Sequence, residues 1–486
     1  MNWKRFSPAG LALLLAAATA TAQQPATTMT PTPQPTPAAA ATTPRPQRQT
    51  PPEGGKPRPF TIPKRETFKL SNGLNVTLVP YGAIPKVTVR AVTRTGNLDE
   101  AAGKTWLADL TGDLMSEGTP TRTAQQISEE AARMGSSLSV SVGEETTSVA
   151  IDALSEYGPE AVALVADVLQ RPSLPASELE RLKTSMLRNL SVARSQPGQL
   201  AFERFRKVLY GDHPFGRLFP EEAALKGFTI EDVRKFYADN FGAQRTHVYV
   251  VGVFDAKEMR RAVTQAFEKW AKGAPATENV PKPTAARALH LIDRPGAAQS
   301  TIYMGLPVVD PSHKDYVPQM VTNYILGGAF TSRITSNIRE NKGYTYSPSS
   351  QVSTRFRDAY WVEIADVTTG VTGPSLKEIF YEIERLQKEP PPEAELRGIK
   401  NNLAGIFVIQ NSSRAGIINQ LALLDLHRLP ETYLTNFVQN VINVTPADVQ
   451  RIARDYLRAD RMAVVVVGDR AKIAEQLKPY GEIVND

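Results

Sequence analysis

Apolar and polar residues alternate along the chain with two different periods, and each period predicts a different kind of element. Residues 75–79 and 87–92 place apolar side chains at every second position, which is typical of β-strands with one buried face. Thr123 and Gln126 have the spacing of a capping box at a helix start, and Gly135 is a suitable stop for that helix. Strands mixed with helices in this way predict an α+β fold. Further strands are predicted near residues 137–142, 146–153, 289–293, 299–306, 344–353 and 357–366, and helices near 158–171, 176–195, 200–210, 313–326, 331–341, 373–388, 391–408 and 430–441.

The same order of segments occurs twice, at a constant separation of 216 residues. A Thr-x-x-Asp helix start at Thr229 recurs at Thr445, and the apolar strand that ends at Gly252 recurs with its end at Gly468. Two matched segments at one separation indicate a duplicated unit. We therefore expect two homologous domains, each with a mixed, mostly antiparallel sheet covered by helices. The predicted boundaries are 61–275 for the N-terminal domain, 276–288 for a linker and 289–486 for the C-terminal domain.

The N-terminal region has the pattern of an exported protein. A charged start, a short apolar run at 11–18 and a small-residue cleavage site at 20–22 identify residues 1–22 as a signal peptide, with an uncleaved anchor as the alternative. Residues 23–60 are rich in Pro, Thr and Ala, and we expect a disordered tether there. No later run is long enough to span a bilayer, so we expect no membrane span after cleavage. The predicted location is the periplasm, in preference to the exterior.

The composition argues against some functions and excludes some kinds of metal site. The chain has 56 Lys and Arg against 50 Asp and Glu, and six of the cations but only one anion precede residue 61. The remainder is therefore nearly neutral, which argues against nucleic-acid binding. The chain has no cysteine, so disulfides and thiolate metal ligands are excluded. No two histidines have the i, i+4 spacing of a zinc-binding helix. The five histidines are His213, His247, His290, His313 and His427.

Six short segments occur in an order and spacing that resemble a known family. They are residues 70–74 (LSNGL), 103–108 (GKTWLA), 115–119 (MSEGT), 210–216 (YGDHPFG), 326–328 (LGG) and 338–346 (IRENKGYTY). Together they resemble the pitrilysin/insulinase peptidases, a family that includes bacterial processing peptidases and subunits of the mitochondrial processing peptidase. The resemblance covers about residues 61–480. It implies that the two domains form half of a clamshell.

The resemblance also implies that the family's zinc site is degenerate here. Active members carry His-x-x-Glu-His on a helix, where two imidazoles bind zinc and the Glu takes a proton from the bound water. Asp109 and Asp113 stand at the two His positions, Gly112 at the Glu position and Asn189 at the third-ligand position. A glycine cannot act as a base, so we expect this chain to bind no cofactor. Asp109 and Asp113 share a helix face, and their like charges repel each other unless a cation lies between them. Another metal ion at this position is therefore an open alternative.

A second group of residues matches the family's substrate-binding segment. In family members an Arg and a Tyr seven residues apart hold the substrate carbonyl and stabilise the oxyanion, and Arg339 and Tyr346 have this spacing. Tyr344 is the alternative tyrosine, since we expect it on the same strand face as Tyr346. Gly327 and Gly328 are expected to form a tight strand-to-helix turn or to allow close backbone approach near bound peptide.

These observations predict a catalytically silent, zinc-free subunit of an exported peptidase. The chain would close the cavity and supply Arg339 and Tyr346 in trans to a homologous partner that binds the zinc. Its substrate would be a peptide or an unfolded protein. The alternatives are a peptide-binding or scaffolding protein without a peptidase role, and a hydrolase with a relocated metal site.

Overall fold

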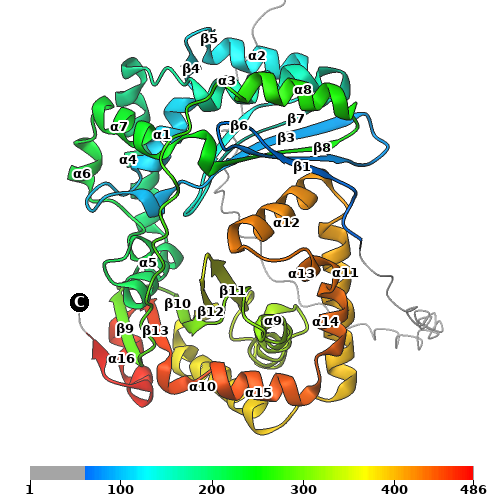
Figure 1. Cartoon of the computed structure of the whole chain (residues 1–486). Coiled ribbons are helices and arrows are strands. Elements are labelled where there is room, and N and C mark those ends of the chain that lie inside the picture. The colour runs from blue at the N-terminus through cyan, green and yellow to red at the C-terminus, as the bar shows by residue number, and fades with distance from the viewer. Residues whose placement is uncertain (1–60, 485–486) are drawn as a thin grey trace, which may run out of the picture. The chain divides into compact units, whose positions relative to one another are not determined.

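Two six-stranded sheets organise the protein, one in each half of the chain (Figure 1). The computed structural model describes residues 61–484, so the predicted signal peptide (1–22) and tether (23–60) lie outside the described residues. The N-terminal half comprises the elements from β1 (Glu66–Lys69) to α8 (Ala256–Phe267), and the C-terminal half those from β9 (Ala288–Asp293) to β14 (Ile483–Val484). The predicted α+β fold with two sheet-containing halves is confirmed.

The N-terminal sheet has the strand order β1-β2-β8-β3-β7-β6. The central strand β8 runs parallel to β2 and antiparallel to β3, and every other pair is antiparallel. Its apolar face packs against α3 and α8 in a buried core. Besides β1, the strands are β2 (Asn75–Pro80), β3 (Lys86–Thr93), β6 (Ser139–Val142), β7 (Thr147–Leu154) and β8 (Thr246–Gly252), and a separate hairpin joins β4 (Gly118–Thr119) to β5 (Arg122–Thr123).

The C-terminal sheet repeats this topology with the order β14-β9-β13-β10-β12-β11. Its central strand β13 is parallel to β9 and antiparallel to β10, as β8 is to β2 and β3. Five strands of each sheet therefore correspond, in agreement with the repeat in the sequence, but the edge strands differ, because β1 is antiparallel to β2 and β14 is parallel to β9. Besides β9 and β14, the strands are β10 (Gln299–Val308), β11 (Ser349–Arg355), β12 (Asp358–Thr368) and β13 (Ala463–Gly468).

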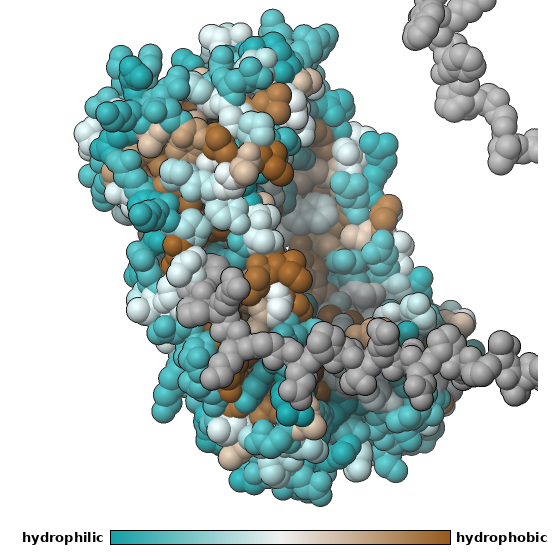
Figure 2. All heavy atoms as spheres, turned by 90° about the vertical axis from the view of Figure 1, so that its right-hand side faces the viewer, coloured by the Kyte–Doolittle hydropathy of each residue, from teal (hydrophilic) through white to brown (hydrophobic). Residues whose placement is uncertain are grey.

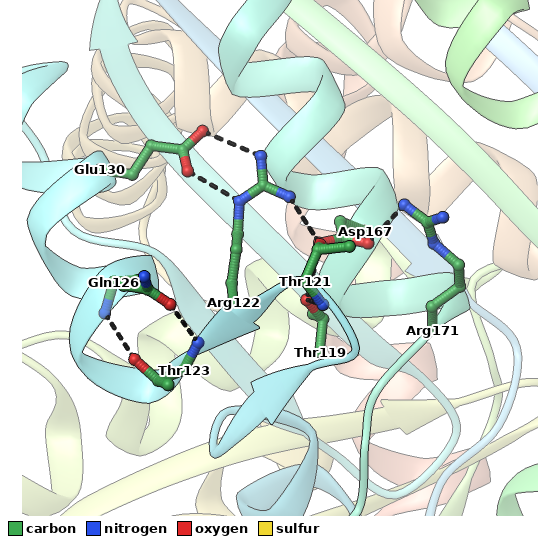
Figure 3. Close-up of polar contacts among 8 residues, drawn as sticks. All are labelled: Thr119, Thr121, Arg122, Thr123, Gln126, Glu130, Asp167 and Arg171. Carbon is green, nitrogen blue, oxygen red and sulfur yellow. Dashed lines mark hydrogen bonds and ion pairs between the residues drawn. The ribbon is translucent and has the colours of Figure 1, made fainter.

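Helices cover the sheets and begin at predicted caps. Thr229 Oγ1 accepts a hydrogen bond from Asp232 N at 3.2 Å, and Thr445 Oγ1 accepts one from Asp448 N at 3.1 Å. Thr123 forms the predicted capping box with Gln126 (Figure 3). The N-terminal half contains α1 (Leu107–Met115), α2 (Ala124–Arg133), α3 (Gly158–Gln170), α4 (Ala176–Ser195), α5 (Pro197–Tyr210), α6 (Glu222–Lys226), α7 (Ile230–Asn240) and α8. The C-terminal half contains α9 (Tyr316–Asn323), α10 (Thr372–Lys388), α11 (Glu393–Gln410), α12 (Arg414–His427), α13 (Thr432–Thr435), α14 (Phe437–Asn443), α15 (Pro446–Tyr456) and α16 (Arg470–Leu477).

Each half contributes one helix that covers the sheet of the other half. Phe205 on α5 packs in a buried cluster with Tyr360 and Val465 of the C-terminal sheet. Ile418 on α12 packs in another with Tyr249 of the N-terminal sheet. Figure 1 shows α12 on the face of the N-terminal sheet opposite α3 and α8. The sequence did not predict α12, because its apolar residues face both halves and form no single stripe.

Three sequence predictions between residues 313 and 353 are wrong in detail. The predicted helix 313–326 is α9 followed by a π-helical turn, η5 (Tyr324–Gly328), and the predicted helix 331–341 ends as a second π-helical segment, η6 (Thr335–Asn341). The strand predicted from residue 344 begins at Ser349. Pro348 lies directly before it, and a proline has no N–H to donate to the ladder.

A cluster of charges joins the halves. Glu144, in the loop between β6 and β7, accepts hydrogen bonds from Arg206 on α5 and from Arg355 at the end of β11. Arg414 at the start of α12 forms a bidentate pair with Asp152 on β7, at 2.9 and 3.0 Å. Polar contacts therefore add to the two apolar clusters between the halves. Over residues 61–484, no helix is long and apolar enough to cross a bilayer.

Candidate functional site

Helix α1 carries the two aspartates that stand at the zinc-ligand positions. The chain enters α1 through Trp106, whose φ of 71° is left-handed and whose indole Nε1 donates to the carbonyl of Leu218 at 3.0 Å. Leu110 is fully buried in the N-terminal core, whereas Asp109 is half-buried and Asp113 is exposed. The helix is therefore anchored on its apolar face and presents both aspartates away from the core.

Asp109 is held in a network with a second carboxyl group. Asn97 Nδ2 donates to Asp109 Oδ2 at 2.7 Å and to Glu100 Oε1 at 3.1 Å. Glu100 also accepts from the backbone N of Ala108 at 2.9 Å. Burial raises the pKa of both carboxyl groups, and that of Glu100 rises to about 8. Glu100 could not be found from a sequence pattern, because it precedes α1 and contacts it only through the fold of the chain.

The raised pKa of Glu100 predicts a pH-dependent stability. A carboxyl group whose pKa is higher in the folded state stabilises the fold fully below its unfolded pKa, and this contribution is lost as pH rises through the folded value. Between pH 5 and 8.5 we expect wild type to lose about 3 kcal/mol of unfolding free energy through this group. Glu100→Gln should remove that loss in denaturant titrations followed by tryptophan fluorescence. Glu156→Gln, at an exposed glutamate, should leave the pH profile of wild type unchanged.

Gly112, at the position of the catalytic glutamate, is closed off by β6. A Cβ atom there would lie 2.4 Å from Val142 Cγ2 and 3.6 Å from Val140 Cγ1. Contacts below 3.0 Å force a neighbour to move, so α1 packs on β6 at a distance that only glycine permits. The position therefore lacks a base and has no room for one.

The remaining donors do not assemble a metal site. Burial raises the pKa of Asp113, and the charges of Asp109 and Glu117 raise it further. Glu117 is paired with Arg181, and Asn189 is exposed on α4. Among residues 61–484 no three His, Asp or Glu side chains lie close enough together to hold a metal ion. The donor set at the family's zinc position therefore does not fit zinc.

Ion pairs and hydrogen bonds around the buried carboxylate of Asp167 hold the hairpin that follows α1 (Figure 3). The hairpin after α1 carries Arg122, which donates to Asp167 Oδ2 on α3 at 2.7 Å and to Glu130 Oε2 on α2 at 2.7 Å. Thr119 also donates to Asp167 at 2.8 Å, and Arg171 lies 2.6 Å from its other oxygen. These contacts tie the hairpin that follows α1 to α2 and α3.

Arg339 lies between two exposed aromatic rings. Its Cζ atom is 4.5 Å from the ring centroid of Phe330 and 5.1 Å from that of Tyr346. Phe330 is 72% exposed and Tyr346 is 79% exposed. Glu340 approaches the guanidinium at 3.3 Å. The structure thus brings the predicted pair together and adds Phe330, which the sequence analysis missed although it lies two residues after Gly328.

Gly327 and Gly328 precede this stack and allow other groups to approach their backbone closely. Both glycines lie in the π-helical turn η5, so the predicted strand-to-helix turn is wrong. A Cβ atom on Gly327 would lie 2.5 Å from Glu363 Oε2, and one on Gly328 would lie 2.5 Å from Asn323 Nδ2. Tyr344 packs against the C-terminal core. Since the strand starts only at Ser349, Tyr344 and Tyr346 do not share a strand face.

The two groups of predicted site residues do not meet within this chain. The ring and ion contacts of Arg339 are all with residues of the C-terminal half, and those of Asp109 and Asp113 are with the N-terminal half. Figure 1 places α1 in the upper half and α9, which leads into η5, in the lower half. In the part of the chain that the structure describes, no hydrogen bond or ion pair links Arg339 or Tyr346 to α1. Within the described residues the two groups therefore make no direct contact with each other.

Two family models match consecutive parts of the chain. The model described as "Insulinase (Peptidase family M16)" matches residues 81–219, and the one described as "Peptidase M16 inactive domain" matches residues 227–403. The first runs from before β3 to beyond α5 and leaves out β1, β2 and β8, and the second runs from before α7 into α11. The two matches therefore span both halves.

Relatives and solved structures match over most of the chain. A Rickettsia bellii protein described as an uncharacterized zinc protease is 23% identical, over 82% of this chain and 96% of its own length. The structure of a protease from Helicobacter pylori has a TM-score of 0.79 at 20% identity, over 84% of this chain and 100% of its own. The periplasmic protease PqqL from Escherichia coli has a TM-score of 0.71 at 17% identity, over 84% of this chain and 46% of its own. These likenesses show a shared fold.

Proposed function

The chain belongs to the insulinase family of peptidases (M16), and on this premise we propose that it is the zinc-free subunit of an exported metallopeptidase. In this role it closes one side of the clamshell cavity against a homologous, zinc-binding partner. Arg339 and Tyr346 then act in trans on a peptide or unfolded protein held at the partner's site. The chain itself performs no proton transfer in the reaction.

The exposed stack of Phe330, Arg339 and Tyr346 carries this proposal. Two large aromatic rings turned to solvent contribute little to the core, yet they hold one guanidinium in a defined place. A fixed cation beside a phenol donor is the arrangement that stabilises a developing oxyanion once water is excluded. Among the described residues, the only carboxylate paired with Arg339 is the exposed Glu340, and this leaves the guanidinium accessible to an oxyanion at a partner's site.

The N-terminal half also favours a zinc-free subunit. Gly112 offers no base and Val142 occupies the space beside it. Asp109 is engaged by Asn97. These contacts disfavour a hydrolase that uses a relocated metal on α1, and they leave the partner's helix as the source of the family's zinc chemistry.

The substrate would bind as an extended strand near the Gly-rich segment. β11 is an edge strand of the C-terminal sheet, so one side of it lacks a neighbouring strand in the described residues. Edge strands pair with extended peptides through backbone hydrogen bonds. Gly327, Gly328 and Tyr344 lie next to this region in the chain and would shape the adjoining wall.

Export to the periplasm is part of the proposal. It rests on the signal-peptide pattern of residues 1–22 and on the tether pattern of 23–60. A solved relative in fold, PqqL, is described as periplasmic. Detection of the mature chain, with its new N-terminus, in a periplasmic extract would support this location.

Co-expression with a zinc-bearing homologue from the same genome tests the function. We expect the pair to co-purify and to cleave peptides at least 100-fold faster than the homologue alone, since this chain supplies oxyanion donors. The purified chain alone should contain no stoichiometric zinc and should cleave no peptide. Equal cleavage with and without this chain would contradict the proposal and favour the peptide-binding or scaffolding alternative. Chelator-sensitive cleavage by the chain alone would favour the relocated-metal alternative.

A further inference from the structure

A polar cavity of about 670 Å³ lies between the N-terminal sheet and α12. Figure 2, which turns the right-hand side of Figure 1 toward the viewer, shows the surface hollowed at mid-height between the two halves. Successive side chains of β3 point to opposite faces of the sheet. Val89 and Ala91 therefore enter the core, while Arg90, Val92 and Arg94 face the cavity and bring two charges to its wall. We call it the inter-half cavity. Its size is within the range of small-molecule sites.

Arg90 is the central cation of the inter-half cavity and has no acidic partner. Its Nη1 donates to the amide oxygen of Asn419 on α12 at 2.7 Å. Its Nε is buried without a hydrogen-bond partner. Burial lowers the pKa of the guanidinium, since water is removed from it. Within residues 61–484 this charge therefore has only one neutral side chain to bind.

Other cavity residues increase the positive charge. Arg94, two positions beyond Val92 on the same side, stacks on Phe356 at 5.3 Å and has no ion pair within the described residues. Arg245 is different, since its guanidinium donates to four backbone carbonyls and lies 3.7 Å from Asp99. The charge of Arg94 also acts on Asp99 and Glu145. Among the described residues, Arg90 is therefore the cavity arginine for which no carboxylate partner is found.

The carboxylate that lines the cavity is already engaged. Asp425 accepts a hydrogen bond from the hydroxyl of Tyr249 and lies 3.0 Å from His247 Nδ1. His247 Nε2 is in turn 2.8 Å from Thr77 Oγ1. Asp425 is therefore committed to the N-terminal sheet and does not neutralise Arg90.

His427 adds an unused polar group to the wall formed by α12. The side chain is only 4% exposed, and its Nδ1 has no hydrogen-bond partner. Burial lowers its pKa, so the ring is neutral near pH 7. A buried ring nitrogen without a partner costs free energy unless a ligand or water meets it.

We propose that the inter-half cavity binds a small polar molecule that carries an oxyanion, either a carboxylate or a phosphate, with Arg90 and Arg94 as its cationic partners. Charge-assisted hydrogen bonds from guanidinium groups suit both anions. Asn419 and His427 on α12 complete the site from the C-terminal half. The ligand would therefore contact both halves and stabilise their contact. This site is independent of the peptidase role.

The test uses the full chain with inorganic phosphate and citrate as separate probes, at constant ionic strength against sodium chloride. We expect one probe to bind at a single saturable site in calorimetry and to raise the Tm, and the identity of that probe distinguishes phosphate from carboxylate. Arg90→Leu should weaken binding about 10- to 100-fold. Arg397→Leu, which removes the same charge from the exposed surface of α11, should bind as wild type does.

Asn419→Asp keeps the test valid if Arg90→Leu fails to fold. The new carboxylate would lie beside the Arg90 guanidinium and supply the missing anion within the protein. We expect this variant to fold with an unchanged or higher Tm and to lose at least 90% of its probe affinity, a tenfold effect. The proposal would be overturned if neither probe binds the wild-type chain saturably. It would also be overturned if the Asn419→Asp variant binds the probe as tightly as the wild-type chain does.

Discussion

An Arg339→Ala variant, assayed in complex with a zinc-bearing partner subunit, should turn over peptide about 100-fold more slowly than the wild-type complex. The guanidinium lies against Phe330 and Tyr346, so in the proposed complex it would enter the partner's site in a fixed orientation. Its charge acts mainly on the oxyanion that forms after water attack, and kcat should therefore fall more than KM changes. Steady-state kinetics of the purified complex measure both.

Three further variants separate chemistry from assembly. Arg339→Lys keeps the charge but loses the planar group that stacks on the rings, so it should restore little activity. Phe330→Ala leaves Arg339 present but supported on one side only, and its kcat should lie between those of wild type and Arg339→Ala. Arg397→Ala is the surface control and should behave as wild type. Unchanged kcat in an Arg339→Ala complex of normal stoichiometry would refute the role of Arg339.

Replacing Glu144 with glutamine should destabilise the fold by about 3 kcal/mol. Glu144 accepts hydrogen bonds from both Arg206 and Arg355, and these arginines are buried in the contact between the halves. Burial alone would raise the pKa of Glu144, but the two arginines outweigh burial and lower it. Without the carboxylate, both buried arginines lose their hydrogen-bonded anion, and Arg355 keeps only its weaker attraction to Glu145 and Asp358. Chemical denaturation at pH 7 measures the loss.

The neighbouring glutamate provides a matched control. Glu145 accepts a hydrogen bond from the backbone N of Phe356 at 3.0 Å, and burial raises its pKa to about 7. A glutamine there keeps the hydrogen-bond acceptor, and near pH 7 the carboxyl group that it replaces is only partly ionised. Glu145→Gln should therefore lower the free energy of unfolding by less than about 1 kcal/mol at pH 7. A lowered pKa stabilises the fold above the unfolded value and loses that effect in acid. The difference between wild type and Glu144→Gln should therefore narrow as pH falls toward 4.

Much of the fold follows from short segments of sequence. The caps at Thr229 and Thr445 form because Thr and Asp bond to local backbone groups in any fold that starts a helix there. The repeat in those segments correctly indicated two equivalent sheets. Gly112 lacks a base in every conformation, so the loss of that function was also visible in the sequence.

Features that depend on distant contacts could not be predicted in this way. Helix α12 has apolar residues on two sides because it lies between the halves, and a periodicity search expects one stripe. Tyr344 and Tyr346 have strand spacing, but the ladder starts only after Pro348. The contact of Gly112 with Val142 joins residues 30 positions apart in two different elements.

Side-chain type and local backbone preference belong to a few neighbouring residues, and they were enough for the α+β class, the duplication and the degenerate zinc positions. Burial and pairing belong to the packed chain. Packing places Asn97 between Asp109 and Glu100, sets Phe330 against Arg339, and leaves Arg90 facing the inter-half cavity without a carboxylate. Each of these contacts depends on which residues the fold brings opposite a side chain. The pattern of residues along the chain does not carry that information.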